Sequence, residues 1–245
     1  MIDSSCSNQK KINFEKVAQI IVNSFWVFVI GSVAGSIIET IVGIFQNGLI
    51  EIRQGLVYGP FVPVYGFGLL VYYFSISKLK RHKKIFFVSM ILGGITEYIF
   101  SYCQEKLFGT VSWDYSDLMF NINGRTSLLH CIYWGGFGIA FVKYLLPILI
   151  KLEKYSVNQK FRIASVICCM VMIINVGISY LAGIRNIERK NNLVADNIIE
   201  EFIDKNYSEE FIDKLYARKI KIDGESDLFT KVNETFQIME FFNLN

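Results

Sequence analysis

Two glutamates and two arginines occur at related places in a strongly apolar sequence. Glu39 and Glu97 each end a G-x-I-x-E motif inside an apolar stretch, where an unpaired carboxylate is costly. Arg53 and Arg125 follow them in the next loops, and each lies near a glycine. A carboxylate in an apolar cavity can have a raised pKa suited to proton transfer, and arginines can hold an anionic headgroup. We therefore expect these four residues, together with Asp114, to form the candidate site.

The same residues allow two interpretations, and the sequence leaves both open. In the first, they converge on a polar cavity in the outer half of a membrane. In the second, they form two buried Glu and Arg pairs that lock helices together. Neither a metal nor a cofactor is expected, because the five cysteines lack metal-ligand spacing and fit small apolar core positions.

Composition requires these residues to be positioned by membrane helices. Hydrophobic residues make up 52% of the 245 positions and charged residues only 19%, which is typical of an integral membrane protein. Four apolar stretches, at about 20–46, 85–103, 126–150 and 163–184, approach the roughly 20 residues needed to cross a bilayer. A fifth lies at about 60–77. The sequence therefore predicts an all-α integral membrane protein with about five transmembrane helices.

Basic residues predict the orientation of these helices. Twelve lysines and arginines lie in the N-terminal flank and in the loops 78–84 and 151–162, against three in the loops 47–60 and 104–125. Basic loops stay in the cytoplasm. We therefore expect a multi-pass protein of the plasma membrane whose N-terminus is cytoplasmic and whose 47–60 and 104–125 loops lie outside.

The segment RQGLVYGPFVPVYGFG, residues 53–68, interrupts the apolar sequence with four glycines and two prolines. Because proline lacks an amide hydrogen and clashes with the preceding turn, Pro60 and Pro63 predict that the second helix begins near Pro63. About 15 residues then remain before Ser77, too few to span a bilayer. Residues 55–62 are predicted to be irregular backbone at membrane depth, where Gly59 and its neighbours turn the chain to form a cavity wall.

An internal repeat connects these features. GSIIE at 35–39 and GGITE at 93–97 are each followed by an arginine-containing loop and then by an aromatic-glycine stretch, YGFG at 65–68 or WGGFG at 134–138. Both copies would begin in the cytoplasm, so the order predicts a parallel two-span repeat about an axis along the membrane normal. The second loop carries an insertion that contains Trp113 and Asp114.

The sequence divides into three regions: a cytoplasmic flank at 1–19, a membrane domain at 20–184 and an acidic soluble tail at 185–245. The tail contains 9 basic and 13 acidic residues. It also contains the repeated segments EEFIDKNY at 200–207 and EEFIDKLY at 209–216. The nine-residue offset allows one continuous helix or a helix, turn, helix pair. We expect a small helical module that takes part in interactions. Five spans would place it outside, whereas Arg185, Arg189 and Lys190 favour the cytoplasm.

The segments GLVYGPFVPVYGFG and WDYSDLMFNINGRTSLLHCIYWGGFG resemble the CmpB-like family of ABC transporter type IV permeases over residues 25–145. The resemblance covers two groups of positions: Gly59, Pro60, Pro63, Tyr65 and Gly66, and then Trp113, Asp114, Tyr115, Ser116, Asn121, Gly124 and Arg125. It implies a permease, and the tail lies outside it.

Three functions remain in competition. A transporter subunit would need a separate ATPase docked on the 78–84 and 151–162 loops, because the sequence contains no G-x-x-x-x-G-K-[ST] motif and is not expected to be catalytic by itself. The alternative is a protein that handles lipids in the outer leaflet or an integral-membrane enzyme. A third hypothesis is a scaffold or sensor whose tail recruits a partner. Membrane lipids and a second copy of the chain are further candidate partners, whereas nucleic acid is not expected.

Overall fold

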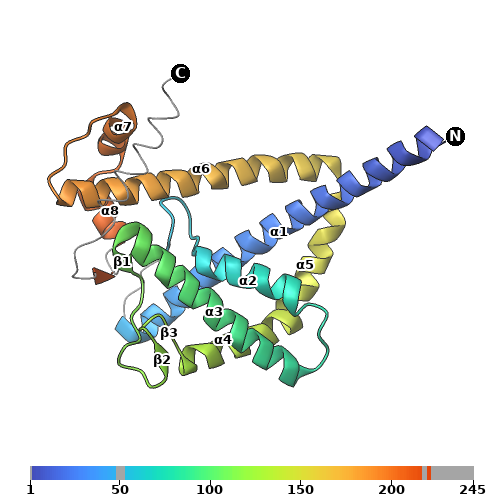
Figure 1. Ribbon diagram of the computed structural model, residues 1–245, viewed down its shortest axis with the longest axis horizontal. Helices are drawn as coiled ribbons and strands as arrows, with labels where there is room; N and C mark the ends of the chain where they lie inside the picture. The colour runs from blue at the N-terminus through green and yellow to red at the C-terminus, as the bar shows by residue number, and fades with distance from the viewer. Residues whose placement is uncertain (1, 48–52, 217–219, 222–245) are drawn as a thin grey trace. The chain divides into compact units, whose positions relative to one another are not determined.

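The computed structural model describes residues 2–47, 53–216 and 220–221, and the described chain is predominantly helical (Figure 1). The helices are α1 (Ile2–Asn47), α2 (Pro63–Ser75), α3 (His82–Phe108), α4 (Leu128–Ala140), α5 (Leu146–Glu153), α6 (Gln159–Lys190), α7 (Ile198–Asn206) and α8 (Glu209–Leu215). A π-helical turn (Phe141–Leu145) joins α4 to α5, and a 3₁₀ turn (Lys154–Val157) follows α5. The short strands are β1 (Thr110–Val111), β2 (Asn121–Ile122), β3 (Thr126–Ser127) and β4 (Ile220–Lys221). The predicted all-α membrane protein is confirmed.

Four segments of the described chain are long and apolar enough to cross a bilayer, namely Glu15–Phe45, His82–Phe108, Leu128–Val157 and Gln159–Lys190. The fifth predicted span corresponds to α2. Its 13 residues cover about 20 Å at 1.5 Å per residue, less than the ~30 Å hydrocarbon core. The predicted count of five spans is therefore not confirmed, whereas the predicted start of this helix at Pro63 is.

The chain forms two compact units. The first comprises residues 1–96 and 129–180, and the second comprises 97–128 and 181–245. The predicted tail thus shares a unit with the loop that joins α3 to α4. Strand β1 of this loop pairs antiparallel with β4 of the tail, and Phe108 at the end of α3 lies against Gly183 of α6. The tail and the loop between α3 and α4 therefore pack together within this unit.

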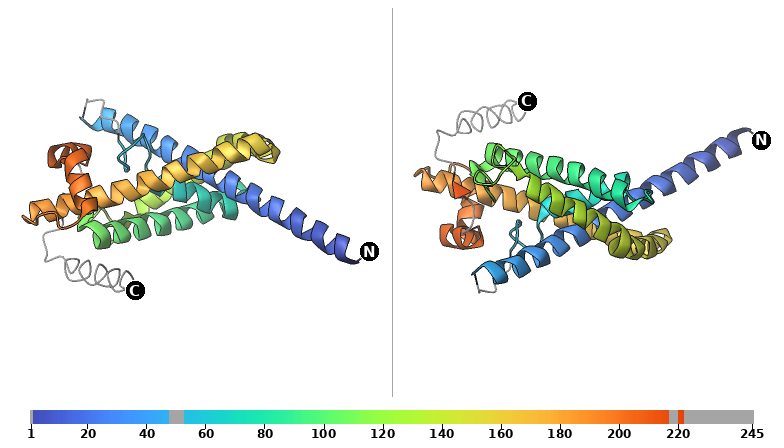
Figure 2. Two further views of the ribbon diagram at one scale, coloured as in Figure 1. Left: turned by 90° about the horizontal axis from the view of Figure 1, so that it is seen from above. Right: turned by 90° about the horizontal axis from the view of Figure 1, so that it is seen from below.

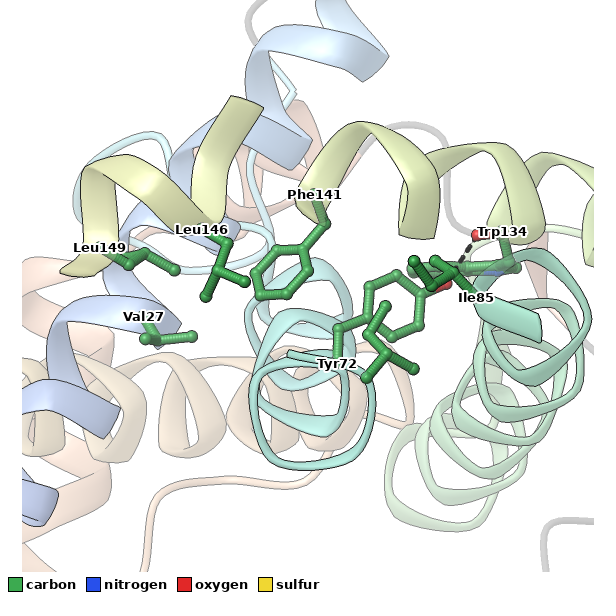
Figure 3. Close-up of a cluster of buried hydrophobic side chains, with 8 residues drawn as sticks. Val27, Tyr72, Ile85, Trp134, Phe141, Leu146 and Leu149 are labelled. Carbon is green, nitrogen blue, oxygen red and sulfur yellow. Dashed lines mark hydrogen bonds between the residues drawn. The ribbon is translucent and has the colours of Figure 1, made fainter. Parts of the chain in front are cut away.

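The core of the first unit is built around two aromatic residues, Tyr72 of α2 and Trp134 of α4 (Figure 3). The Tyr72 hydroxyl donates hydrogen bonds to the carbonyl oxygens of Trp134, at 2.7 Å, and Ser89, at 3.2 Å. The buried phenol is thereby satisfied and joins α2 to both α3 and α4. Aliphatic and aromatic side chains complete the cluster: Val27, Ile76, Ile85, Phe141, Leu146 and Leu149.

Helix contacts recur in the two copies of the predicted repeat. Residues of α1 correspond to residues 58 positions later in α3, and residues of α2 to residues 69 positions later in α4. The Tyr65 ring lies over Gly35, and the Trp134 ring lies over Gly93. Two further contacts have counterparts. The Phe28 ring packs on Gly66, as the Phe86 ring packs on Gly135. Gly31 packs against Leu69, as Ser89 packs against Gly138. These small residues allow the close helix approach that membrane helices use for association.

Equivalent residues of the two copies also face each other. The rings of Tyr65 and Trp134 lie 5.6 Å apart between centroids, and those of Tyr72 and Phe141 lie 5.9 Å apart. Each pair consists of a residue and its own counterpart, as occurs across a two-fold axis. The contacts between α2 and α4 therefore agree with the parallel repeat predicted from the sequence.

The two basic loops lie at one end of the first unit. The Tyr73 hydroxyl of α2 donates a hydrogen bond to the Glu153 carboxylate at the end of α5. The loop after α2 and the turn after α5 are thereby held together. This arrangement agrees with the prediction that both loops lie on one side of the membrane.

The tail repeat forms two separate short helices, so the helix, turn, helix alternative is correct. Asn197 caps α7, and Ser208 caps α8 by accepting a hydrogen bond from the Phe211 amide. Ile203 and Ile212 are equivalent in the repeat, and both are buried. Each copy therefore presents the same apolar residue to the unit interior.

Helices α7 and α8 lie beside the end of α6 (Figure 2), and the repeated aspartates hold them there. Asp204 accepts hydrogen bonds from Arg185, at 2.9 and 3.0 Å, and from Arg189, at 2.8 Å. Asp213 accepts from Asn186, at 2.9 Å, and from Lys190. The basic residues that favoured a cytoplasmic tail thus have a structural role in docking it.

We expect Asp204→Asn to loosen the docked tail, because Arg185 and Arg189 both lose the carboxylate that they share. Trypsin should then cleave the full-length protein several-fold faster in residues 185–205, as measured by mass spectrometry. Glu209→Gln is the control, because this exposed side chain belongs to none of the tail ion pairs formed by the described residues. Equal cleavage of both variants and wild type would contradict the docking role.

The same ion pairs predict how docking depends on pH. The Arg185 and Arg189 hydrogen bonds lower the pKa of the Asp204 carboxyl from its ordinary value of 3.8. A carboxyl with a depressed pKa stabilises the docked state above its unfolded pKa and loses that contribution as the pH falls through the folded value. Resistance of the tail to pepsin, a protease that is active at acidic pH, should therefore be unchanged near pH 5 and decline only below about pH 4.

Candidate functional site

The segment 53–62 of the first unit is irregular, as predicted for residues 55–62, and protein groups satisfy its backbone. The Val57 amide donates to Ser179 Oγ, at 2.8 Å, and the Tyr58 amide donates to Asn175 Oδ1, at 3.1 Å. Asn175 returns a hydrogen bond from Nδ2 to the Tyr58 carbonyl, at 2.7 Å. On the other side, the Val62 amide donates to the Ser32 carbonyl of α1, at 3.1 Å. The segment is therefore clamped between α1 and α6.

These contacts fall in the middle of two candidate spans. Asn175 lies midway along α6, between its ends at Gln159 and Lys190. Ser32 lies close to the midpoint of the span Glu15–Phe45. Residues 57–62 therefore contact the central parts of two candidate spans. Their predicted depth in the membrane, where irregular backbone persists only if protein or water satisfies it, stays a prediction. We call residues 53–62 the re-entrant segment.

Glycine and proline shape the re-entrant segment. Gly59 has a φ of +78°, in the left-handed region that glycine adopts without strain, and a Cβ there would meet the Phe61 ring. The amide of Gly55 donates to the Phe61 carbonyl, at 2.8 Å, which closes the turn around the exposed Pro60. Pro63 then occupies the first turn of α2, where a missing amide hydrogen is harmless.

Arg53 begins the re-entrant segment beside α1. Its amide donates to Thr40 Oγ1, at 3.3 Å, and its carbonyl accepts from Ser36 Oγ. Among the described residues, no acidic side chain forms an ion pair with the Arg53 guanidinium, and its buried Nε atom has no hydrogen-bond partner. A partly buried cation without a counter-charge is costly, and in membrane proteins it is typical of a functional position.

Glu39 lies on α1 between the two hydroxyl residues that hold Arg53. Ser36 is one turn before it and Thr40 is the next residue, and the Glu39 side chain is half-buried. The first unit therefore places the predicted pair Glu39 and Arg53 in one neighbourhood. The predicted convergence with the residues of the second unit stays a prediction.

In the second unit, Glu97 is buried and holds the loop between α3 and α4. The residue is only 6% exposed, and its carboxylate accepts from Thr126 Oγ1, at 2.8 Å, and from the Tyr115 hydroxyl, at 3.2 Å. Glu97 thus joins α3 to the loop at two positions, Tyr115 and Thr126.

Arg125 has an acidic partner that we did not predict. It forms an ion pair with Glu105 of α3, and its guanidinium lies 5.5 Å and 5.4 Å from the ring centroids of Tyr98 and Tyr102. Such cation–π contacts favour a guanidinium over aromatic faces. The structural interpretation thus fits Arg125, but with Glu105 as partner.

Trp113 and Asp114 stabilise the loop itself. The Trp113 indole donates to the Arg125 carbonyl, at 2.9 Å, and its ring stacks on Tyr115. Asp114 is exposed and accepts from the Ser116 amide, at 2.9 Å, and from Ser116 Oγ, at 2.6 Å. These hydrogen bonds lower the pKa of the Asp114 carboxyl. A lowered pKa disfavours Asp114 as a proton-accepting base at neutral pH.

The predicted site residues thus fall into three groups. Glu39, Arg53, Gly59, Pro60 and Pro63 belong to the re-entrant segment and its support, whereas Glu97, Trp113, Asp114 and Arg125 belong to the loop of the second unit. Tyr65 lies in the packed core, over Gly35. Sequence reasoning missed the polar residues that hold the segment, Asn175 and Ser179. Their i, i+4 spacing in a strongly apolar span was the available signal.

Comparison with known proteins gives one match. Residues 26–180 match the model of the family described as "Putative ABC-transporter type IV". The match takes in the re-entrant segment, the loop between α3 and α4, and the two α6 residues that hold the segment. Neither curated proteins nor solved structures gave a match. Because the matched residues make up more than half of the sequence, the chain belongs to this ABC-transporter type IV family.

Proposed function

We propose that the chain is the membrane subunit of an ABC-type transporter and that its substrate passes the re-entrant segment. The observation that carries this proposal is the hydrogen bonding of residues 57–62 to the middles of α1 and α6. Transporters place substrate sites where membrane helices are interrupted in this way. Membership of an ABC-transporter family supports the same function.

The residues beside the segment favour an anionic substrate. The Arg53 guanidinium has no ion-pair partner among the described residues, so a bound anion would supply the missing charge. Glu39 lies one turn from Ser36 on α1, and its negative charge would repel an anion. The anion would therefore bind more easily together with a proton or a cation. We propose this neighbourhood as the polar cavity in the outer half of the membrane.

Energy for transport would come from a separate ATPase on the basic loops. Residues 78–84 include five exposed lysine and arginine side chains, and the Tyr73 hydrogen bond to Glu153 holds this loop beside the turn after α5. Two neighbouring short loops at one end of the unit provide a docking surface for an acidic partner.

Affinity purification after mild cross-linking tests this proposal. We expect a nucleotide-binding subunit to be recovered with the wild-type chain and to be largely lost with the double variant Arg81→Glu/Lys83→Glu, because charge reversal repels an acidic partner. Lys106→Glu is the matched control, since Lys106 is an exposed basic residue at the opposite end of α3. Failure to recover an ATPase, while known complexes are captured in the same sample, would contradict the transporter function.

The Arg53 guanidinium, which has no ion pair among the described residues, also favours a second function. In this function, the chain alone moves or modifies an anionic lipid of the outer leaflet. Purified chain in vesicles would then redistribute or convert labelled phosphatidylglycerol without ATP. An ATP requirement for any such activity would exclude this second function.

A further inference from the structure

The loop between α3 and α4 exposes three large apolar side chains. Met119 is 79% exposed, Phe120 72% and Ile122 57%. We call these residues the apolar apex. Clustered apolar side chains that face outward usually mark a surface that contacts another apolar phase.

The apex is held in a defined conformation. Asn121 Nδ2 donates to the carbonyls of Leu118, at 2.8 Å, and Ser116, at 3.0 Å, and Asn121 Oδ1 accepts from the Gly124 amide, at 3.1 Å. Strand β2, which contains Ile122 of the apex, pairs with β3. Phe120 itself has a φ of +56°, a left-handed conformation that is rare for a bulky residue and persists where the surroundings impose it.

The apex lies beside the start of a candidate membrane span. The Leu128 amide donates to the Phe120 carbonyl, at 3.3 Å, and Leu128 is the first residue of the span Leu128–Val157. Leu128 is itself 41% exposed. The apolar surface of the apex therefore continues onto the first residue of the span.

The loop also divides into a polar and an apolar half. Asp114, Ser116 and Asp117 are exposed in the first half, before Met119. Trp113 and Tyr115 flank Asp114 and stack on each other. Tryptophan and tyrosine are enriched at the membrane–water interface.

We propose that the apolar apex inserts into the membrane leaflet next to the start of α4. Met119 and Phe120 enter the acyl region, and Asp114 and Asp117 remain in water. Insertion of this kind follows from apolar burial and does not depend on a specific headgroup. The occupant is thus the bilayer itself, and the inference is independent of the proposed transport function.

Spin-label accessibility in phosphatidylcholine nanodiscs tests the proposal. Single cysteines at Met119 and Phe120, in a background with the five native cysteines replaced, should carry nitroxides that collide with oxygen more than with a water-soluble nickel chelate. A label at Asp117, exposed in the same loop, is the matched control and should show the reverse. Equal nickel accessibility at Met119 and Asp117 would overturn the proposal. Protection of Met119 from both reagents would also overturn it, because a protein surface would then cover the apex.

A second measurement needs no substitution. Hydroxyl-radical footprinting of the wild-type protein in the same nanodiscs should label Phe120 less than Phe211 of α8, although Phe211 is only 44% exposed. Water-borne radicals reach Phe120 if it projects into solvent, so stronger labelling of Phe120 than of Phe211 would contradict insertion.

Discussion

Gly93→Ala is expected to lower the free energy of unfolding by about 1–3 kcal/mol, because overpacking a close helix contact forces side chains or backbone to move. A methyl group at this position would collide with the Trp134 ring. The Trp134 ring has little room to move, because Gly68 of α2 packs against its other edge. The Tyr72 hydroxyl also fixes the Trp134 backbone through a hydrogen bond to its carbonyl oxygen. Thermal unfolding in detergent would measure the loss.

Gly136→Ala is the control for this experiment. Gly136 lies on α4, two residues after Trp134, and a Cβ there meets nothing within 4 Å. The substitution should leave the stability unchanged or raise it by up to about 1 kcal/mol through helix propensity. If Gly93→Ala and Gly136→Ala unfold at the same temperature, the close approach of α3 and α4 is wrong.

The repeat extends this prediction to the first copy. Gly35→Ala should be destabilising to a similar degree, because the Tyr65 ring occupies the place that Trp134 occupies over Gly93. Similar losses at Gly35 and Gly93 would show that the two copies share one packing arrangement.

Arg53→Gln is expected to abolish anion-dependent function while the unfolding temperature stays near that of wild type. Among the described residues, the guanidinium forms no ion pair, so its removal leaves no carboxylate there without a partner. A bound anion, in contrast, loses the positive charge that would hold it. Anion-stimulated ATP hydrolysis by the purified complex measures function. Retention of phosphatidylglycerol by the chain alone, measured by native mass spectrometry, gives a readout that does not require the ATPase.

Arg125→Gln provides the opposite expectation. Its removal leaves Glu105 without its partner and removes the cation from Tyr98 and Tyr102, so the loop should loosen and the unfolding temperature should fall. Comparable losses of stability in both variants would show that Arg53 is structural. Unchanged function in Arg53→Gln would remove it from the site.

Local chemistry explains what the sequence could predict. The start of α2 at Pro63 follows from the covalent structure of proline, which fixes φ and removes a donor wherever it occurs. The repeated order of glycine, glutamate and aromatic-glycine residues predicted corresponding contacts, because small residues permit helix approach in any membrane. These features depend on residues close together or on simple spacing.

Partner choice could not be predicted in the same way. Glu97 and Arg125 are natural partners by charge, but Arg125 pairs with Glu105 and Glu97 holds two hydroxyl groups. Which group each glutamate meets depends on the hairpin of β2 and β3, which directs Thr126 toward Glu97 and the adjacent Arg125 toward Glu105. Similarly, Asn175 is more than 100 residues from Tyr58, and only the folded chain brings them together.

The facing of equivalent residues across α2 and α4 has a historical consequence. A chain with one copy of this helix pair would bring each of these residues against the same residue of a second molecule. Such an ancestor could function as a homodimer encoded by a gene of half the length. Duplication and fusion would then free the copies to diverge, so that one acquired the re-entrant segment and the other the hairpin loop.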